Sequence, residues 1–172
     1  MSLPDPIAIR AFLDDPHRAL APVVGAFAAA ASRELPEPAD DAEARTRARA
    51  WLTRLGEGGW LDPIRRRDWR GCCLTREALG AASPLADAVF ALQGLSTVPL
   101  HFADNEAMRS RWLEDAVSGR AMGAFAMTEA GAGSDAAAIA TRARRDGSAY
   151  VLDGRKTFIS NAGIADFYTV FA

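Results

Sequence analysis

The sequence changes character near residue 120, and this change constrains the fold more than any other feature. Up to Gly119 the apolar residues recur mostly with helical spacing, and polar capping residues and prolines separate the segments. The uncharged segment AMGAFAMT (121–128) follows, without helical periodicity, and β-type runs fill the remainder. The sequence therefore predicts an α+β fold, with an N-terminal all-α helical bundle domain over 1–119 and an incomplete antiparallel β domain over 120–172.

Two long helices are predicted in the first third of the chain. The segment 14–34 has Asp15 as its N-cap and Pro16 at the first helical position, with Pro22 early enough to be tolerated or to mark a restart. A proline-rich break at 35–41 separates it from a second helix, which ends at the glycine-rich GEGG. One face of that second helix carries the apolar residues Ala48, Trp51, Leu52 and Leu55.

Three further helices are predicted before residue 120. They cover 70–83, then 83–100 with Ser83 and Pro84 as its start signal, then 103–119 from Asp104 or Asn105 to Gly119. The middle one is apolar nearly all round, so it is expected at the centre of the bundle. The last is expected to place inward the residues Met108, Trp112, Leu113 and Val117.

The strand region contains one strong hairpin signal. The segment 148–160 consists of two runs joined by Asp153-Gly154, a pair that favours a tight β-turn. A third run, ADFYTVFA (165–172), would leave an apolar sheet edge uncovered. We therefore expect either a fragment of a longer protein or a sheet completed by a second chain.

Composition and charge exclude several classes of function. The 172 residues carry a net charge of -2, which leaves nothing to hold a nucleic acid. Cys72 and Cys73 are adjacent, which predicts two buried, reduced thiols and neither a disulfide nor a metal site. The apolar stretch 20–31 is too short to span a membrane, and the acidic residues before it do not suit a secretory signal. A cytoplasmic protein without membrane attachment is expected.

A glycine loop, AGAGSDA (130–136), follows the first predicted strand. Gly131, Gly133 and Ala136 satisfy the dinucleotide fingerprint G-x-G-x-x-G/A, so a nicotinamide-binding β-α-β unit is one interpretation, with 135–145 as its helix. Against it, the acidic residue at the required distance, Asp153, lies in the predicted hairpin turn, and the chain then folds back. The fingerprint also follows a long helical domain, where a β-α-β unit would normally stand by itself.

The same loop concentrates groups that suit a different ligand site. Gly131 and Gly133 lack a Cβ and let the main chain approach a ligand, while Thr128 and Ser134 add hydroxyl donors. Successive N–H groups in such a turn form an anion-binding concavity. The segment TFISN (157–161) is predicted to face the same space.

The segments AFAMTEAGAGSD, YVLDGRKTFISNAGIADF and EAMRSRWLEDAVSGR together resemble the acyl-CoA dehydrogenase family of flavoproteins, over about residues 72–172. The resemblance implies FAD as the cofactor and α,β-desaturation of an acyl-CoA thioester, with hydride transfer to flavin N5. Electrons would pass to an electron-transfer flavoprotein or to oxygen, and a complete chain would form a homotetramer.

The resemblance also implies roles for particular residues. Thr128 and the main chain of Met127 would donate to the pyrimidine edge of the flavin, with Phe125 beside them. Ser134 would lie where the FAD phosphates meet the CoA arm of the substrate. Phe158 would pack on the flavin ring, Ile159 would continue that contact, and Ser160 would donate near N5. The expected cofactor-binding residues are thus Phe125, Met127, Thr128, Gly133, Ser134, Phe158, Ile159 and Ser160.

The sequence departs from the family pattern in a few places. Ala130 stands where proline is frequent, Phe158 where tryptophan is frequent and Ser160 where threonine is frequent. Glu129 is interpreted as a buried or capping carboxylate. In the family the catalytic glutamate comes from a second helical domain after the β domain, so no carboxylate here is assigned as the base. The isolated chain is expected to be inactive, and a non-catalytic flavin- or CoA-binding subunit completed by another chain is the alternative.

Overall fold

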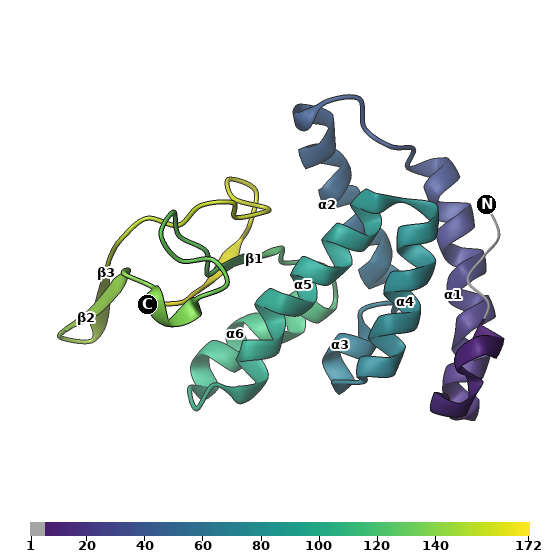
Figure 1. Ribbon diagram of the computed structural model, residues 1–172, viewed down its shortest axis with the longest axis horizontal. Coiled ribbons are helices and arrows are strands. Elements are labelled where there is room, and N and C mark those ends of the chain that lie inside the picture. Colours follow the sequence, from purple (N-terminus) through teal and green to yellow (C-terminus); the bar gives the residue numbers. More distant parts are fainter. Residues whose placement is uncertain (1–5) are drawn as a thin grey trace.

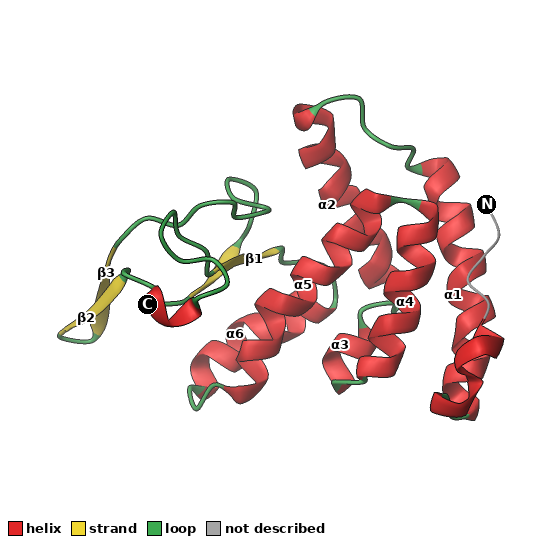
Figure 2. Cartoon of the chain, in the orientation of Figure 1, coloured by secondary structure: helices red, strands yellow, loops and turns green. Residues whose placement is uncertain are grey.

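The computed structural model describes residues 6–172, which form a helical part and a smaller part with short strands (Figures 1 and 2). The helical part contains a 3-10 helix at Pro6–Phe12 and the helices α1 (Asp15–Glu34), α2 (Asp41–Glu57), α3 (Asp62–Arg66), α4 (Trp69–Ala82), α5 (Pro84–Phe102) and α6 (Glu106–Val117). The second part contains the strands β1 (Gly123–Ala126), β2 (Arg142–Asp146), β3 (Ala149–Asp153) and β4 (Phe167–Val170). The predicted α+β class is confirmed, and the change of character falls between α6 and β1.

The helices begin close to the residues that the capping signals indicated. The Ser83 hydroxyl accepts from the Ala86 N–H (3.1 Å) at the start of α5, and the Asn105 side chain accepts from the Met108 N–H (3.1 Å) at the start of α6. The prediction for α1 is shifted by one residue, because Asp14 is the extended N-cap and Asp15 the first helical residue. Pro22 lies within α1, which continues without a restart.

Helix α5 occupies the centre of the molecule (Figure 1), as its uniformly apolar sequence predicted. It packs against α2, α3, α4 and α6 on the helical side and against β1 and β4 on the other. The predicted apolar face of α2 is buried against it. The largest side chains with almost no exposure are Trp51, Phe90, Leu52, Leu55, Leu61, Ile64, Leu79 and Met122.

Two predictions about burial are wrong. Cys73 is exposed and only Cys72 is partly covered, because adjacent helical positions point about 100° apart and α4 buries one side only. Met108 is 46% exposed, although Val117 of the same helix is buried. Met108 lies in the first turn of α6, whereas the buried residues of that helix, Ala116 and Val117, lie at its other end.

The prediction of a hairpin over 148–160, with its turn at Asp153-Gly154, is wrong: β3 pairs with the strand before it, and residues 154–160 form no strand. Strands β2 and β3 pair antiparallel, with Arg142 opposite Asp153 and Asp146 opposite Ala149, so the two-residue turn lies at Gly147-Ser148. Gly147 has the positive φ of 61° that such a turn requires. Gly154 does not form a hairpin turn and instead lies directly against Thr141. A Cβ at position 154 would be 2.3 Å from the Thr141 hydroxyl oxygen. The second Asp-Gly pair therefore permits a close approach of two segments.

The other pair of strands differs from the antiparallel expectation. Strands β1 and β4 are parallel neighbours, from Gly123 opposite Phe167 to Ala126 opposite Val170. A parallel pair requires a long connection, which residues 127–166 provide with the loop and the hairpin. The glycine loop therefore leaves the sheet at the carboxyl end of β1.

A buried glutamine attaches the strands to the helical part. The Gln93 side chain of α5 donates to the carbonyls of Ala116 and Ala121 (2.8 Å each) and accepts from the Gly123 N–H (3.0 Å). Gly123 lies so close to α5 that a Cβ there would be 2.0 Å from the Ser96 hydroxyl oxygen. These contacts fix the start of β1, and hence the loop that follows it, relative to the helices.

Candidate functional site

The loop at 127–134 turns tightly as it leaves β1. The Glu129 N–H donates to the Ala132 carbonyl (3.0 Å), and the Ala132 N–H donates back to the Glu129 carbonyl (3.2 Å). Gly131 and Gly133 are exposed, and a Cβ at either position would meet nothing within 4 Å. The outer side of the loop is therefore open, with room for a ligand to contact the main chain.

The Glu129 side chain points towards the protein interior and holds the loop in place from its inner side. Its carboxylate accepts hydrogen bonds from Lys156 Nζ (2.8 Å), from the N–H groups of Ala140 (2.8 Å) and Thr141 (3.0 Å), and from the Thr141 hydroxyl. The bond from Lys156, followed by those from Thr141 and Ala140, lowers the pKa of Glu129 to about 2. Of the two interpretations, a buried or a capping carboxylate, the structure confirms that Glu129 is buried.

The segment 156–161 runs beside the loop and is tied to it. Lys156 Nζ also donates to the Met127 carbonyl (2.9 Å), and the Thr157 N–H donates to the Thr128 carbonyl (2.9 Å). Phe158 follows with a φ of 55° and a side chain that is 90% exposed. A non-glycine residue in the left-handed region is uncommon, and an aromatic one with its ring in solvent is more so. The backbone therefore holds the Phe158 ring away from the protein interior.

The structure brings some of the predicted site residues together and leaves others apart. Met127 and Thr128 are joined to the segment that carries Phe158 through the bonds at Lys156 and Thr157. Phe125 lies against Phe171, with ring centroids 5.0 Å apart. Ser134, like Gly133, is exposed on the outer part of the loop, and no hydrogen bond within the described residues 6–172 ties its side chain to the rest of the site.

A hollow separates Phe158 from the helical part. Its volume is about 490 Å³, and α2 contributes Asp41, Ala44, Arg45 and Ala48 to its wall. The opposite wall contains Phe158, Ile159, Ser160, Asn161 and Ala162. Phe158, Ile159 and Ser160, which were predicted to lie on the flavin ring and near N5, thus line one space.

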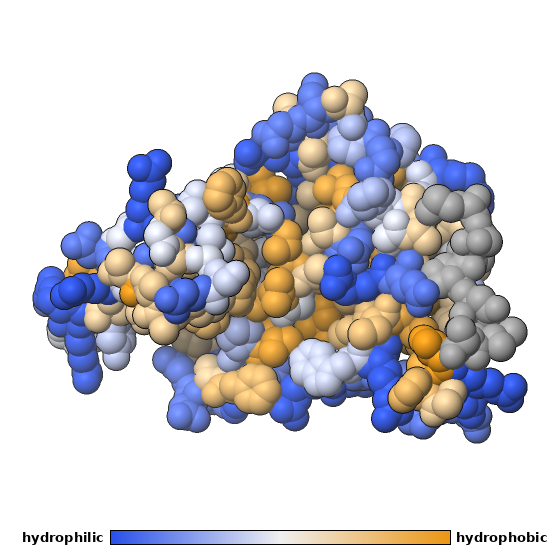
Figure 3. All heavy atoms as spheres, in the orientation of Figure 1, coloured by the Kyte–Doolittle hydropathy of each residue, from blue (hydrophilic) through white to orange (hydrophobic). Residues whose placement is uncertain are grey.

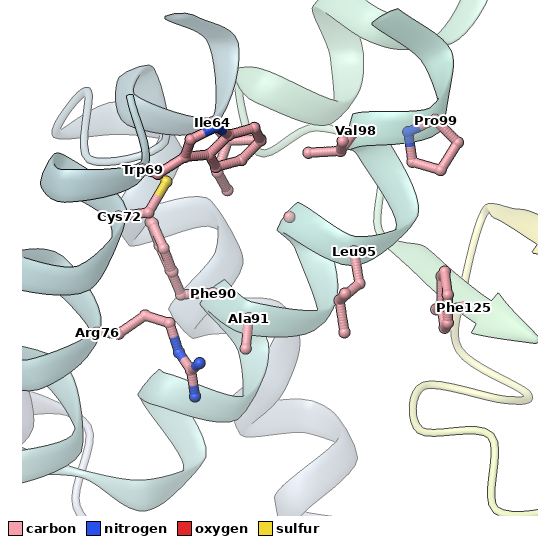
Figure 4. Close-up of a pocket in the computed structure, with 11 residues that line it drawn as sticks. Ile64, Trp69, Cys72, Arg76, Phe90, Ala91, Leu95, Val98, Pro99 and Phe125 are labelled. Carbon is pink, nitrogen blue, oxygen red and sulfur yellow. The ribbon is translucent and has the colours of Figure 1, made fainter. Parts of the chain in front are cut away.

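An apolar cavity of about 400 Å³ opens between α4, α5 and β1 (Figure 4). Trp69, Cys72 and Arg76 of α4 line one side, α5 contributes residues such as Leu95, and Phe125 of β1 completes the wall. In the space-filling view, apolar side chains gather over the middle of the helical part (Figure 3). The charge of Arg76 is balanced by two hydrogen bonds to Asp87, at 2.7 and 2.9 Å, so the cavity presents little free charge.

Sequence reasoning missed Lys156 and Thr141 as members of the site. One signal was available for the first: Lys156 is the single lysine among the 20 lysine and arginine residues of the chain. Thr141 carried no such signal, because its position beside Glu129 depends on the path of the chain between the glycine loop and β2.

The structure does not support the nicotinamide interpretation. A dinucleotide-binding turn requires a helix whose N-terminus faces the pyrophosphate. Here the loop is followed by a 3-10 turn at Ala136–Ala138 and then by strand β2. Within residues 6–172, no three His, Cys, Asp or Glu side chains are grouped to hold a metal ion, and no helix is long and apolar enough to cross a bilayer.

Comparisons with known proteins agree with this geometry. The model of the acyl-CoA dehydrogenase middle domain matches residues 124–172. Benzylmalonyl-CoA dehydrogenase from Aromatoleum aromaticum is 34% identical over 168 residues, covering 93% of this chain and 44% of that protein. The crystal structure of glutaryl-CoA dehydrogenase from Mycobacterium smegmatis superposes with a TM-score of 0.74 at 26% identity, covering 98% of this chain and 45% of that one. A structure of the same dehydrogenase in complex with FADH2 gives 0.69 at 28% identity, covering 95% and 44%.

The chain thus spans less than half the length of the relatives it matches. Over that length nearly the whole chain superposes on these dehydrogenase structures. The chain belongs to the acyl-CoA dehydrogenase family and matches its N-terminal and middle-domain region, about 45% of a full-length relative.

Proposed function

We propose that the chain supplies the N-terminal helical domain, residues 1–119, and the start of the flavin-binding middle domain, residues 120–172, of an FAD-dependent acyl-CoA dehydrogenase. The substrate would be an acyl-CoA thioester, desaturated between its α and β carbons. The relatives named above support this class of reaction, since each is a CoA-ester dehydrogenase by name and one was solved with FADH2.

The exposed ring of Phe158 is the observation that carries the proposal. Leaving a phenyl ring 90% in water forgoes about 1.5–3 kcal/mol of burial, and the left-handed backbone costs about 1–3 kcal/mol more. A flat aromatic ligand seated on Phe158 would recover much of the burial energy. The open main chain at Gly131 and Gly133 is suited to an anionic part of the same ligand, so the residues present fit FAD.

The site residues divide into three tasks under this proposal. The Met127 main chain and Thr128 donate hydrogen bonds to the pyrimidine edge of the flavin, where negative charge develops during reduction. Phe158 and Ile159 cover the ring, and Ser160 donates near N5. Gly133 and Ser134 face the FAD phosphates and the CoA arm of the substrate. When bound, FAD supplies the hydride acceptor for the β-carbon of the thioester.

The apolar cavity beside Phe125 is suited to the acyl group. Its lining is mainly apolar, and Asp87 neutralises Arg76, so an uncharged acyl chain would enter more favourably than a free carboxylate. Electrons would pass from the reduced flavin to an electron-transfer flavoprotein or to oxygen. The complete protein would be a homotetramer.

No carboxylate of the chain is proposed as the catalytic base. Glu129 directly follows Thr128, but its oxygens already accept four hydrogen bonds and its pKa is about 2. A carboxylate with so low a pKa is a poor proton acceptor at neutral pH. The chain alone is therefore expected to bind flavin without catalysing desaturation.

The substitution Thr128→Val tests the proposal. It removes one hydroxyl donor while keeping the shape of the side chain, so FAD binding should weaken about 2- to 10-fold, the loss of one hydrogen bond. The measurement is an equilibrium titration of the chain with FAD, followed by flavin fluorescence. Thr53→Val, at an exposed position of α2, is the matched control. Equal FAD affinity in both variants would remove Thr128 from its proposed role.

A further inference from the structure

The ion pair between Glu129 and Lys156 is unusually well covered. The two side chains are 9% and 11% exposed, and Nζ lies 2.8 Å from Oε1. In every other ion pair that the structure describes within residues 6–172, at least one partner is 35% exposed or more. Removing two charges from water costs several kcal/mol per ion, and their attraction often does no more than offset this cost. Stability alone is therefore a weak reason for the pair.

The pair ties together the segments that form the site. Lys156 Nζ donates to the Glu129 carboxylate and to the Met127 carbonyl, so one ammonium group joins the loop at two points. Glu129 in turn accepts from Thr141 and Ala140, which lead into β2. The loop is thus held from its inner side, while its outer side at Gly131 stays open.

The hydrogen bond from Lys156 to the Met127 carbonyl determines the direction in which the Thr128 N–H points. In a trans peptide the N–H points away from the preceding carbonyl, and the described chain contains no cis peptide bond. Because Lys156 holds the Met127 carbonyl on the inner side, the Thr128 N–H is directed to the opposite side. Release of that carbonyl would let the 127–128 peptide plane rotate and turn this donor away.

At position 156, beside Glu129, a lysine side chain fits the available space better than an arginine would. The other 19 of the 20 lysine and arginine residues are arginine, yet the one beside Glu129 is lysine. A compact ammonium group distributes its three N–H bonds tetrahedrally, so it can reach the Met127 carbonyl and the carboxylate together. A planar guanidinium is larger and presents its donors as a fork, which suits a single carboxylate better.

We propose that Lys156, itself held by Glu129, is a positioning residue for the flavin: it fixes the 127–128 peptide so that the Thr128 N–H and hydroxyl face the pyrimidine edge. This inference rests on the proposed function. Since the pair is neutral as a whole, it orients the donors without adding a net charge near the ring.

The test compares two double variants of the chain. K156M/E129Q removes both charges while roughly conserving volume, so no unpaired charge is left buried. R65M/E114Q removes the bidentate pair between α3 and α6, away from the loop, and is the matched control. For each protein we would measure the FAD dissociation constant, the midpoint potential of the bound flavin and the midpoint of thermal unfolding.

The expected result is an FAD dissociation constant at least tenfold higher in K156M/E129Q, with a lower flavin midpoint potential. The control should bind FAD like the wild type, and K156R should be impaired like the double variant. If K156M/E129Q does not fold, E129Q keeps the side-chain shape, removes only its charge and is judged by the same two flavin measurements.

Two other results separate a failure of this inference from a failure of the proposed function. A folded K156M/E129Q variant with wild-type FAD affinity and potential would overturn the positioning role while leaving the proposed function intact. A folded wild-type chain that does not bind FAD would overturn the proposed function, and this inference with it.

Discussion

Gln93 makes the sharpest prediction about how the site is held in place. Replacing it with methionine keeps the length of the side chain but removes its hydrogen bonds to Ala116, Ala121 and Gly123. The Ala116 carbonyl keeps a second donor, the Gly119 N–H at 3.3 Å. The Ala121 carbonyl and the Gly123 N–H would lose the Gln93 partner in a region that is almost fully buried.

An unpaired buried backbone group costs about 1–3 kcal/mol, so Gln93→Met should lower the free energy of unfolding by about 2–6 kcal/mol. The measurement is urea unfolding followed by circular dichroism. Thr97→Val is the matched control on the same helix, because the buried Thr97 hydroxyl has no hydrogen-bond partner within the described part of the chain. It should leave stability unchanged or raise it. A Gln93→Met variant within 0.5 kcal/mol of the wild type would refute the role given to Gln93.

Two further predictions concern the loop and the strand before it. Gly123→Ala should lower the free energy of unfolding by about 1–3 kcal/mol in the same assay, because its Cβ would lie 2.0 Å from the Ser96 hydroxyl oxygen. Gly133→Ala should stay within about 0.5 kcal/mol of the wild type, since its Cβ would meet open space. An equal loss of unfolding free energy in Gly123→Ala and Gly133→Ala would contradict this packing. Hydrogen bonds, first from Lys156, lower the pKa of Glu129 from 4.5 to about 2, so its contribution to stability is complete above pH 4.5 and is lost as the pH falls towards 2. In thermal unfolding measured against pH, Glu129→Gln should be less stable than the wild type at pH 7 and approach it near pH 2; a constant difference would contradict the assignment.

Much of the helical part could be predicted, because local signals and tertiary packing agree there. Ser83 and Asn105 cap the helices they were expected to cap, and the apolar spacing of α2 identified its buried face. The hairpin was misplaced because the sequence offers two Asp-Gly pairs, at 146–147 and 153–154. The turn forms at Gly147-Ser148, while Gly154 packs against Thr141.

The two segments that form the site could be predicted from the sequence, but the contacts that join them could not. The glycine loop and the segment 157–161 stand out by composition, since both combine small residues with hydroxyl groups. The parallel pairing of β1 with β4 and the bonds from Lys156 to Met127 and Glu129 join positions distant in the sequence. No periodicity or spacing rule specifies such contacts, because they depend on the path of the whole connection.

The central claim is that residues 121–160 form a surface for FAD, and an equilibrium titration tests it most directly. The purified chain would be titrated with FAD and, in parallel, with NAD, with binding followed by changes in the visible flavin band and in tryptophan fluorescence. Circular dichroism would establish that the helices are folded. The account predicts saturable binding of FAD and none of NAD. A folded chain that leaves the flavin spectrum unchanged, or that binds NAD instead, would contradict it.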